Sequence, residues 1–237
     1  MPSWVTHMMI ADGVLTALPE LDKRGFCAGS VAPDCNRSVP GGFEPPREVT
    51  HFMLDARKRL DDCERFAAAH PIARAAGAEE AAFLAGYYAH LLADARFQAF
   101  TRDPARVKAM RQRIRAAGIQ IPEDTPDSWT DAKALLGKPR LLSEIAAIER
   151  AYLAARPDSV WFTVLPEVGR VPDLLPELPK GAIAEKLPLM LVMPESDADP
   201  KGNLFLSEAE YAAYVNGIVW EAARRLTYCV FPSQLIQ

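Results

Sequence analysis

The chain of 237 residues is poor in the residue types that usually build metal or disulfide frameworks, with only four histidines and four cysteines. No apolar run approaches the ~20 residues that span a bilayer. The first residues, Met-Pro-Ser-Trp-Val-Thr-His, lack the basic region and the small-residue cleavage site of a signal peptide. We therefore expect no transmembrane segment and a cytoplasmic protein. No C-x-x-C spacing or disulfide framework is indicated by the four cysteines, which are Cys27, Cys35, Cys63 and Cys229.

Positive charge is not in excess either, since the net charge is −4 and the sequence pI is about 5.7. No general electrostatic attraction to nucleic acid or anionic lipid is expected from this balance. A basic run between Arg102 and Arg115 is typical of a solvated helix face rather than a nucleic-acid surface. The chain is 49% hydrophobic, which supplies ample material for a core. We predict one domain over residues 1–237 and no nucleic-acid partner.

Helical patterns dominate the first hundred residues. Ser3 is a plausible N-cap for a first helix that ends near Pro19. Glycines and prolines from Gly25 to about Arg47 predict a long loop, and a loop of this length inside a domain is usually functional or disordered. A second helix is predicted from about Val49 to Ala69, and a third from about Ala78 to Phe100.

Beyond residue 100 the patterns predict the helical completion of the same domain. Amphipathic or capped helices are predicted over about 104–117, 141–155 and 207–228, the last with Ser207 and Glu210 as a capping box. Strand-like runs are few, namely Trp161–Leu165 and Leu189–Met193. The predicted fold class is therefore all-α, a compact multi-helix domain.

All four histidines lie in the first hundred residues, and three of them, His7, His51 and His90, accompany two aspartates, Asp34 and Asp94. His90 and Asp94 are four residues apart, so on a helix they project to one side, one turn apart. His7, Asp34 and His51 lie on otherwise apolar segments. Imidazole nitrogen and carboxylate oxygen together suit zinc, so the pattern predicts a zinc site.

Four stretches of the N-terminal part resemble one known family. They are Ser-Trp-Val-Thr-His (3–7), Gly-Ser-Val-Ala-Pro-Asp-Cys (29–35), Glu-Val-Thr-His-Phe (48–52) and Phe-Leu-Ala-Gly-Tyr-Tyr-Ala-His-Leu-Leu-Ala-Asp (83–94). In order, spacing and context they resemble the zinc-dependent phospholipase C family, all-helical enzymes related to the fungal zinc single-strand nucleases.

The resemblance implies a set of ligands and a reaction. Asp34, His51, His90 and Asp94 match the ligands of one zinc, and His7 matches a ligand of a second zinc that Asp94 would share. The implied activity is phosphoester hydrolysis, in which a metal-activated water attacks phosphorus. Asp34 would also orient that water, which makes it the predicted catalytic residue. The implied substrate is a small-molecule or lipid phosphoester, and one or two zinc ions are expected.

The sequence departs from the family pattern at two places. Family members use the amino group of an N-terminal tryptophan as a ligand, whereas Trp4 is preceded by Met-Pro-Ser. No histidine follows His90, so a further metal site formed by downstream histidines cannot form in the same way. The pattern therefore predicts at most two zinc ions, one with a full set of protein ligands and one with few.

Several residues and functions have more than one interpretation. Cys35 follows Asp34 directly but is not expected to be a ligand, His70 is expected to be structural, and Arg96 is expected to be a surface or ion-pair residue. Thr6 and Thr50 precede histidines and either orient them or simply pack. The alternatives to a phosphoester hydrolase are a non-catalytic protein with a structural zinc and a metal hydrolase of other esters.

Overall fold

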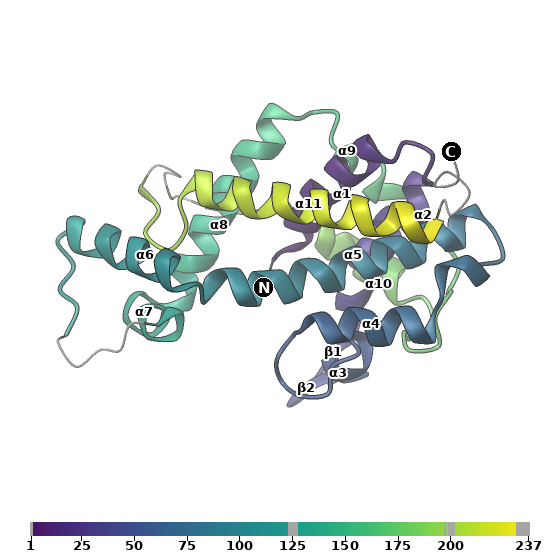
Figure 1. Cartoon of the computed structure of the whole chain (residues 1–237), viewed down its shortest axis with the longest axis horizontal. Helices are drawn as coiled ribbons and strands as arrows, with labels where there is room; N and C mark the ends of the chain where they lie inside the picture. Colours follow the sequence, from purple (N-terminus) through teal and green to yellow (C-terminus); the bar gives the residue numbers. More distant parts are fainter. Residues whose placement is uncertain (1, 123–127, 197, 199–201, 231–237) are drawn as a thin grey trace. The chain divides into compact units, whose positions relative to one another are not determined.

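The computed structural model describes residues 2–122, 128–196, 198 and 202–230. Helices make up most of these residues, and the strands β1 (Arg37–Val39) and β2 (Gly42–Glu44) pair as one antiparallel hairpin (Figure 1). The predicted all-α fold class is confirmed. Contacts divide the chain into two units. The first comprises Met1–Arg96, Asp158–Val192 and Val215–Gln237, and the second comprises Phe97–Pro157 and Met193–Tyr214. A single domain over residues 1–237 stays a prediction.

Helix α1 (Trp4–Ala17) begins as predicted, because the Ser3 side chain accepts a hydrogen bond from the Thr6 N–H. The helix is buried over most of its length, including His7. Asp12 fixes it to the short helix α9 (Val160–Thr163), since its carboxylate accepts hydrogen bonds from Ser159 Oγ at 2.6 Å and Val160 N at 2.8 Å. The N-terminal helix is therefore held firmly inside the first unit.

The prediction of a long loop from Gly25 to about Arg47 is wrong, because most of this segment forms helices and a hairpin. It contains α2 (Lys23–Val31), the 3₁₀ helix η1 (Ala32–Asp34) and the hairpin. Asp22 caps α2 by accepting a hydrogen bond from Gly25 N. A Cβ at Gly29 would overlap the carbonyl oxygen of Phe83 on α5 (Ala78–Thr101). The glycines here allow two helix backbones to approach closely instead of breaking a helix.

The prediction of one helix from Val49 to Ala69 is also wrong, since the chain here forms two helices separated by residues 51–59. These are α3 (Arg47–Thr50) and α4 (Leu60–Ala69). Phe52 takes a left-handed backbone conformation with φ of 54°, and its ring packs on Phe66 with centroids 5.2 Å apart. The packing of this ring overrides the local helical pattern. His51 consequently lies at the C-terminal end of α3 rather than inside a long helix.

The predicted third helix is confirmed as α5, and the remaining elements of the first unit are short. They are η2 (Ile72–Arg74), α9, η3 (Leu165–Arg170) and α10 (Ala182–Met190). The strand-like runs Trp161–Leu165 and Leu189–Met193 are not strands, because they fall mainly in α9 and at the end of α10. The capping box that starts α11 (Glu208–Val230) is confirmed by reciprocal hydrogen bonds between Ser207 and Glu210.

The second unit contains α6 (Pro104–Ala116), α7 (Trp129–Leu136) and α8 (Lys138–Ala155). The basic helix α6 is only partly a solvated face. Arg106 is 6% exposed and donates hydrogen bonds to the carbonyl oxygens of Phe100, Thr101 and Phe205. This guanidinium therefore fixes the backbone of the unit.

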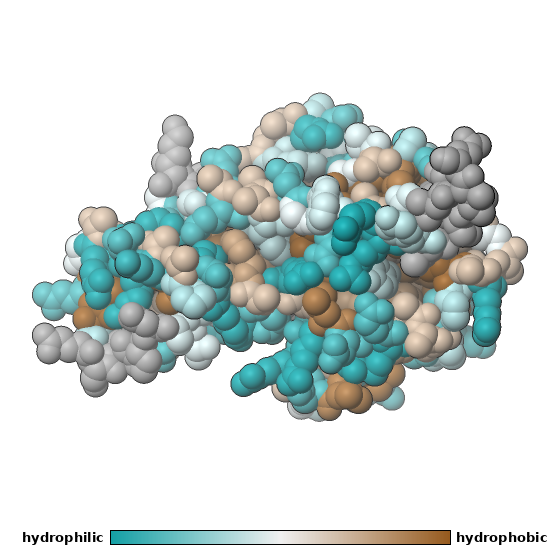
Figure 2. Space-filling model, in the orientation of Figure 1, coloured by the Kyte–Doolittle hydropathy of each residue, from teal (hydrophilic) through white to brown (hydrophobic). Residues whose placement is uncertain are grey.

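Among the described residues, none of the helices is long and apolar enough to cross a bilayer. On the face shown in Figure 2, hydrophilic residues are interspersed with small hydrophobic areas. The cysteines whose side chains are described, Cys27, Cys35 and Cys63, are buried and free of disulfides.

Candidate metal centre

All five predicted zinc ligands lie in the first unit, where the fold brings them together from four elements. His7 comes from α1, Asp34 from η1 and His51 from the end of α3, and His90 and Asp94 both come from α5. Their donor atoms form two overlapping groups of three. Within each group, the donor atoms all lie within 4.8 Å of one another. One group is His7, His90 and Asp94, and the other is Asp34, His51 and His90. His51 lies at the end of α3 instead of inside the predicted longer helix, and it still belongs to the cluster.

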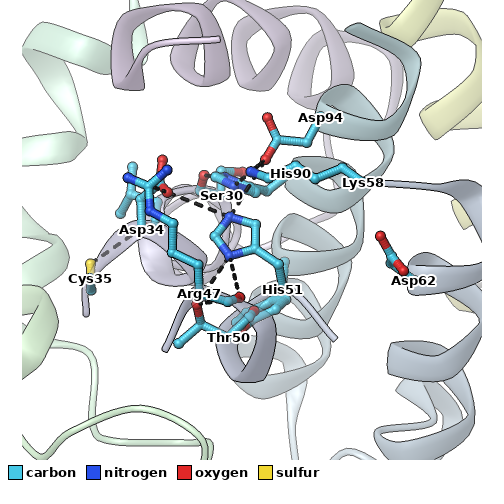
Figure 3. Close-up of polar contacts among 12 residues, drawn as sticks. Ser30, Asp34, Cys35, Arg47, Thr50, His51, Lys58, Asp62, His90 and Asp94 are labelled. Carbon is cyan, nitrogen blue, oxygen red and sulfur yellow. Dashed lines mark hydrogen bonds and ion pairs between the residues drawn. The ribbon is translucent and has the colours of Figure 1, made fainter. Parts of the chain in front are cut away.

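The distances around His51 and His90 are those of groups that face a common centre. His51 Nε2 lies 3.5 Å from Asp34 Oδ1 and 3.5 Å from Asp94 Oδ2, and Figure 3 shows its ring between these carboxylates. His90 Nε2 lies 3.4 Å from Asp94 Oδ2, as expected for residues one helical turn apart. The His7 and His90 rings stack with centroids 3.9 Å apart.

The outer nitrogen of each of two imidazoles is held by the protein. His90 Nδ1 lies 2.9 Å from the Ser30 carbonyl oxygen, and His51 Nδ1 lies 3.1 Å from the Arg47 carbonyl oxygen. The Thr50 hydroxyl also contacts His51 Nδ1 at 3.0 Å, a contact that fits the interpretation of Thr50 as an orienting residue. An imidazole that donates from Nδ1 to a carbonyl keeps its lone pair on Nε2. Both lone pairs therefore face the cluster.

Five buried polar atoms of the cluster have no hydrogen-bond partner. They are the Nε2 atoms of the three histidines and one oxygen of each carboxylate, namely His7 Nε2, His51 Nε2, His90 Nε2, Asp34 Oδ1 and Asp94 Oδ1. Buried polar atoms are almost always paired, so a cluster of unpaired acceptors needs an explanation. A zinc ion accepts this combination of nitrogen and oxygen donors and would satisfy several of them at once.

Burial and neighbouring charges set the protonation states that a metal requires. Burial lowers the pKa of His7 well below its ordinary value of 6.5, and it also lowers the pKa of His51. Burial acts to raise the pKa of Asp34, but its contacts with His51 and His90 outweigh this and lower the pKa. Burial likewise acts to raise the pKa of Asp94, and the charge of Lys58 is the largest of the effects that lower it well below its ordinary value. Neutral imidazoles and ionised carboxylates are the forms that bind metal.

The sequence reasoning missed two cations at the cluster. Lys58 lies in the segment between α3 and α4, and its ammonium forms a buried ion pair with Asp94 Oδ2. Arg47 Nη2 lies 4.0 Å from Asp34 Oδ1, with its guanidinium 4.5 Å from the centre of the Phe43 ring. Lys58 is surrounded in sequence by other charged residues, so no local pattern distinguishes it. Its burial is decided by tertiary packing.

Residues expected to lie outside the site do so. Cys35 donates its thiol hydrogen bond to the Val31 carbonyl oxygen, and burial raises the pKa of that thiol. His70 ends α4, and its Nε2 lies 3.0 Å from Glu177 Oε1. Arg96 makes two hydrogen bonds of 2.7 Å to Glu221, which confirms the predicted ion pair.

Comparison with known proteins gives one match. Residues 6–96 match the family model described as zinc dependent phospholipase C, and this segment contains all five predicted ligands together with Lys58. No curated protein and no solved structure matches the chain. The matched segment covers less than half of the chain. The resemblance of the N-terminal part to the zinc-dependent phospholipase C family, which the sequence predicted, is therefore confirmed.

Proposed function

We propose that the chain is a zinc-dependent phosphoester hydrolase whose centre is the cluster of His7, Asp34, His51, His90 and Asp94. The observation that carries this proposal is the set of buried donor atoms without partners, aimed at one another from four separate elements. The match to a zinc-dependent family over the same residues supports it independently.

Asp34, His51, His90 and Asp94 would hold the principal zinc ion, and His7 would complete or extend its coordination. Zinc bound there would supply Lewis-acid stabilisation of the phosphoryl charge and would activate water as a nucleophile at neutral pH. The lowered pKa of Asp34 keeps this carboxylate ionised and able to accept a hydrogen bond from that water. Its side chain is 11% exposed against 2% for Asp94, so Asp34 is the acid nearer to solvent.

Arg47 is the residue we propose for binding the substrate phosphate. Its side chain is 33% exposed and its guanidinium lies close to Asp34, at the accessible edge of the cluster (Figure 3). A guanidinium offers several N–H donors in a planar arrangement that matches phosphate oxygens. The Phe43 ring below it limits the orientations of the guanidinium. The substrate class is a small-molecule or lipid phosphoester.

A structural zinc without catalysis is the second candidate, and the deep burial of His7, His51 and His90 favours it. The two candidates differ in whether zinc-loaded protein turns over substrate. A hydrolase acting on other esters is the third outcome that a substrate panel distinguishes.

The test is hydrolysis of chromogenic phosphomonoesters, phosphodiesters and carboxyl esters by the zinc-loaded chain. Three variants accompany it: His90→Ala removes a candidate ligand, Arg47→Met removes the proposed phosphate contact, and His70→Ala is the control. We expect phosphoester hydrolysis in wild type and His70→Ala, a loss of at least about a hundredfold in His90→Ala, and a loss of about tenfold in Arg47→Met. Zinc-loaded wild type that hydrolyses only carboxyl esters, or no ester, would overturn the proposal.

A further inference from the structure

Lys58 places a positive charge inside the cluster that the zinc proposal does not use. Its side chain is 5% exposed, and its ammonium contacts Asp94 Oδ2 (Figure 3). Lysine is almost never buried unless its charge is paired, because removing an ammonium from water is costly. The burial of the Lys58 ammonium therefore needs an explanation, which its contact with the candidate metal centre can supply.

His90 limits the number of metal ions that the cluster can hold well. It belongs to both possible ligand groups. Its Nδ1 is engaged by the Ser30 carbonyl oxygen, so only Nε2 remains, and this atom has one lone pair. His90 can therefore ligate one ion at a time. If it serves the ion held by Asp34 and His51, then a second ion would have only His7 and Asp94 from these groups.

Asp94 is the residue that two ions would have to share. One of its oxygens, Oδ2, carries the contact with the Lys58 ammonium, and the other, Oδ1, is buried without a partner. Oδ2 is also the oxygen that faces His51 Nε2 at 3.5 Å and His90 Nε2 at 3.4 Å, so this carboxylate oxygen already lies between a cation and the imidazoles. An additional dication next to the ammonium would repel it strongly in a buried site.

Charge balance leads to the same conclusion. The cluster holds two carboxylates, Asp34 and Asp94, and imidazoles that must be neutral to ligate. One zinc ion balances the two carboxylates, and the Lys58 ammonium and the partly exposed Arg47 guanidinium add positive charge that a phosphate substrate would offset. Two zinc ions and an ammonium would leave a large uncompensated positive charge in the interior.

We propose that the Lys58 ammonium takes the place of a second metal ion, so that Asp94 bridges one zinc ion and one ammonium and the centre binds a single zinc ion per chain. This inference rests on the proposed zinc centre and adds to it the metal stoichiometry and the residue that sets it. Lys58 is a positioning and charge-balancing residue in this account.

The experiment is a zinc titration of the full chain after removal of metal, with bound zinc counted by elemental mass spectrometry and checked by calorimetry. Lys58→Met keeps a side chain of similar length without the charge. Lys58→Gln keeps N–H donors for Asp94 and also lacks the charge, so it serves if the methionine variant does not fold. Arg57→Met removes one positive charge from the exposed neighbouring position and is the matched control.

We expect one zinc per chain in wild type and Arg57→Met, and a second, weaker zinc in Lys58→Met and Lys58→Gln. Two zinc ions in wild type, or a single zinc in both uncharged Lys58 variants, would overturn the inference while leaving the zinc centre intact. No zinc in any of the four proteins would instead refute the proposed function. Cobalt(II) gives an independent readout, because a second site adds a second set of absorption bands to the Lys58 variants alone.

Discussion

Asp94 in the first unit and Glu144 in the second are both buried acids that pair one oxygen with a cation, and they differ in the hydrogen bonding of the other oxygen. Glu144 Oε2 accepts hydrogen bonds from Leu204 N at 2.9 Å and Phe205 N at 2.8 Å, and Oε1 accepts one from Arg140 Nε at 2.9 Å. Asp94 instead has one oxygen without a partner and the other in contact with a lysine. A buried acid that is saturated by backbone donors stabilises a fold, whereas one that faces unpaired imidazole nitrogens is suited to hold an ion.

The same contrast separates the histidines. His70 has its Nε2 next to the Glu177 carboxylate, and it belongs to neither of the two groups of candidate metal ligands. His51 and His90 have their outer nitrogens fixed by carbonyl oxygens and their inner nitrogens without partners. The difference lies in which nitrogen the protein satisfies, and it identifies candidate ligands more sharply than the residue type does.

The largest effect is expected where the fold that builds the centre depends on the close backbone approach of α2 and α5. Gly29→Ala would drive a methyl group into the Phe83 carbonyl of α5, so α2 must move away and carry Ser30 with it. We expect a loss of about 3 kcal/mol in the free energy of unfolding and a loss of zinc binding. Denaturant unfolding and zinc titration measure the two effects. Gly42→Ala, at the start of β2 where a Cβ would meet nothing within 4 Å, is the control and should change neither.

The next largest effect tests the claim that Glu144 stabilises the fold and does not hold zinc. Glu144→Ala leaves the amide N–H groups of Leu204 and Phe205 without their acceptor. We expect the free energy of unfolding to fall by about 2–3 kcal/mol while zinc content stays at the wild-type value. Asp94→Asn should show the converse, with zinc binding lost. Equal loss of zinc in both variants would break the distinction drawn between the two acids.

A pH titration of stability in the zinc-free chain sharpens the contrast among the histidines. Burial lowers the pKa of His7 and His51 in the folded chain below 6.5, the ordinary value that applies when the chain is unfolded. Above that pH the rings are neutral in both states and add no pH dependence. Below it the unfolded chain takes up protons that the folded chain does not, so stability falls by up to about 1.4 kcal/mol per pH unit for each ring.

The carboxylates act in a lower window. The pKa values of Asp34 and Asp94 are lowered below 3.8, so their contribution is complete above that pH and is lost only as the pH falls toward the lowered values. Thermal unfolding between about pH 7 and pH 5 therefore reports the buried rings of His7 and His51 rather than Asp34 and Asp94. His7→Asn should reduce the slope. A wild-type stability that does not change over this range would contradict the assignment of buried neutral rings.

The smallest effect concerns the hydroxyl that contacts His51. Thr50→Val keeps the shape of the side chain and removes the contact of Oγ1 with His51 Nδ1, while the Arg47 carbonyl oxygen remains. We expect zinc affinity to fall by about tenfold with little change in stability. Calorimetric titration measures this change. Thr16→Val, in which the hydroxyl bonds only the Asp12 carbonyl within α1, is the control and should retain wild-type affinity.

Local sequence patterns were sufficient for the elements that follow helical rules. The Ser3 cap, the stripe that places His90 and Asp94 on one face of α5, and the capping box at Ser207 are all present. The pattern failed at Gly25 and Gly29, because glycine permits close helix packing as readily as it breaks a helix. It failed at Phe52 because aromatic packing with Phe66 ends α3 early.

The candidate site divides in the same way. The five candidate ligands could be predicted because the chain has few histidines and places three of them with Asp34 and Asp94 in stretches that resemble one family. Lys58 and Arg47 could not, since a charged residue in a charged segment gives no local sign of burial. Their positions follow from the chain path between α3 and α4 and from the hairpin that presents Phe43.

The measurement that tests the central claim most directly is the zinc content of the purified chain, determined by elemental mass spectrometry beside His90→Ala and His70→Ala. The unpaired buried nitrogens and oxygens predict one zinc ion per chain in wild type and His70→Ala, and none in His90→Ala. A rise in melting temperature on adding zinc should follow the same pattern, because a ligand that binds only the folded state stabilises it. Wild-type protein that carries no zinc and takes up none when it is added would contradict the account.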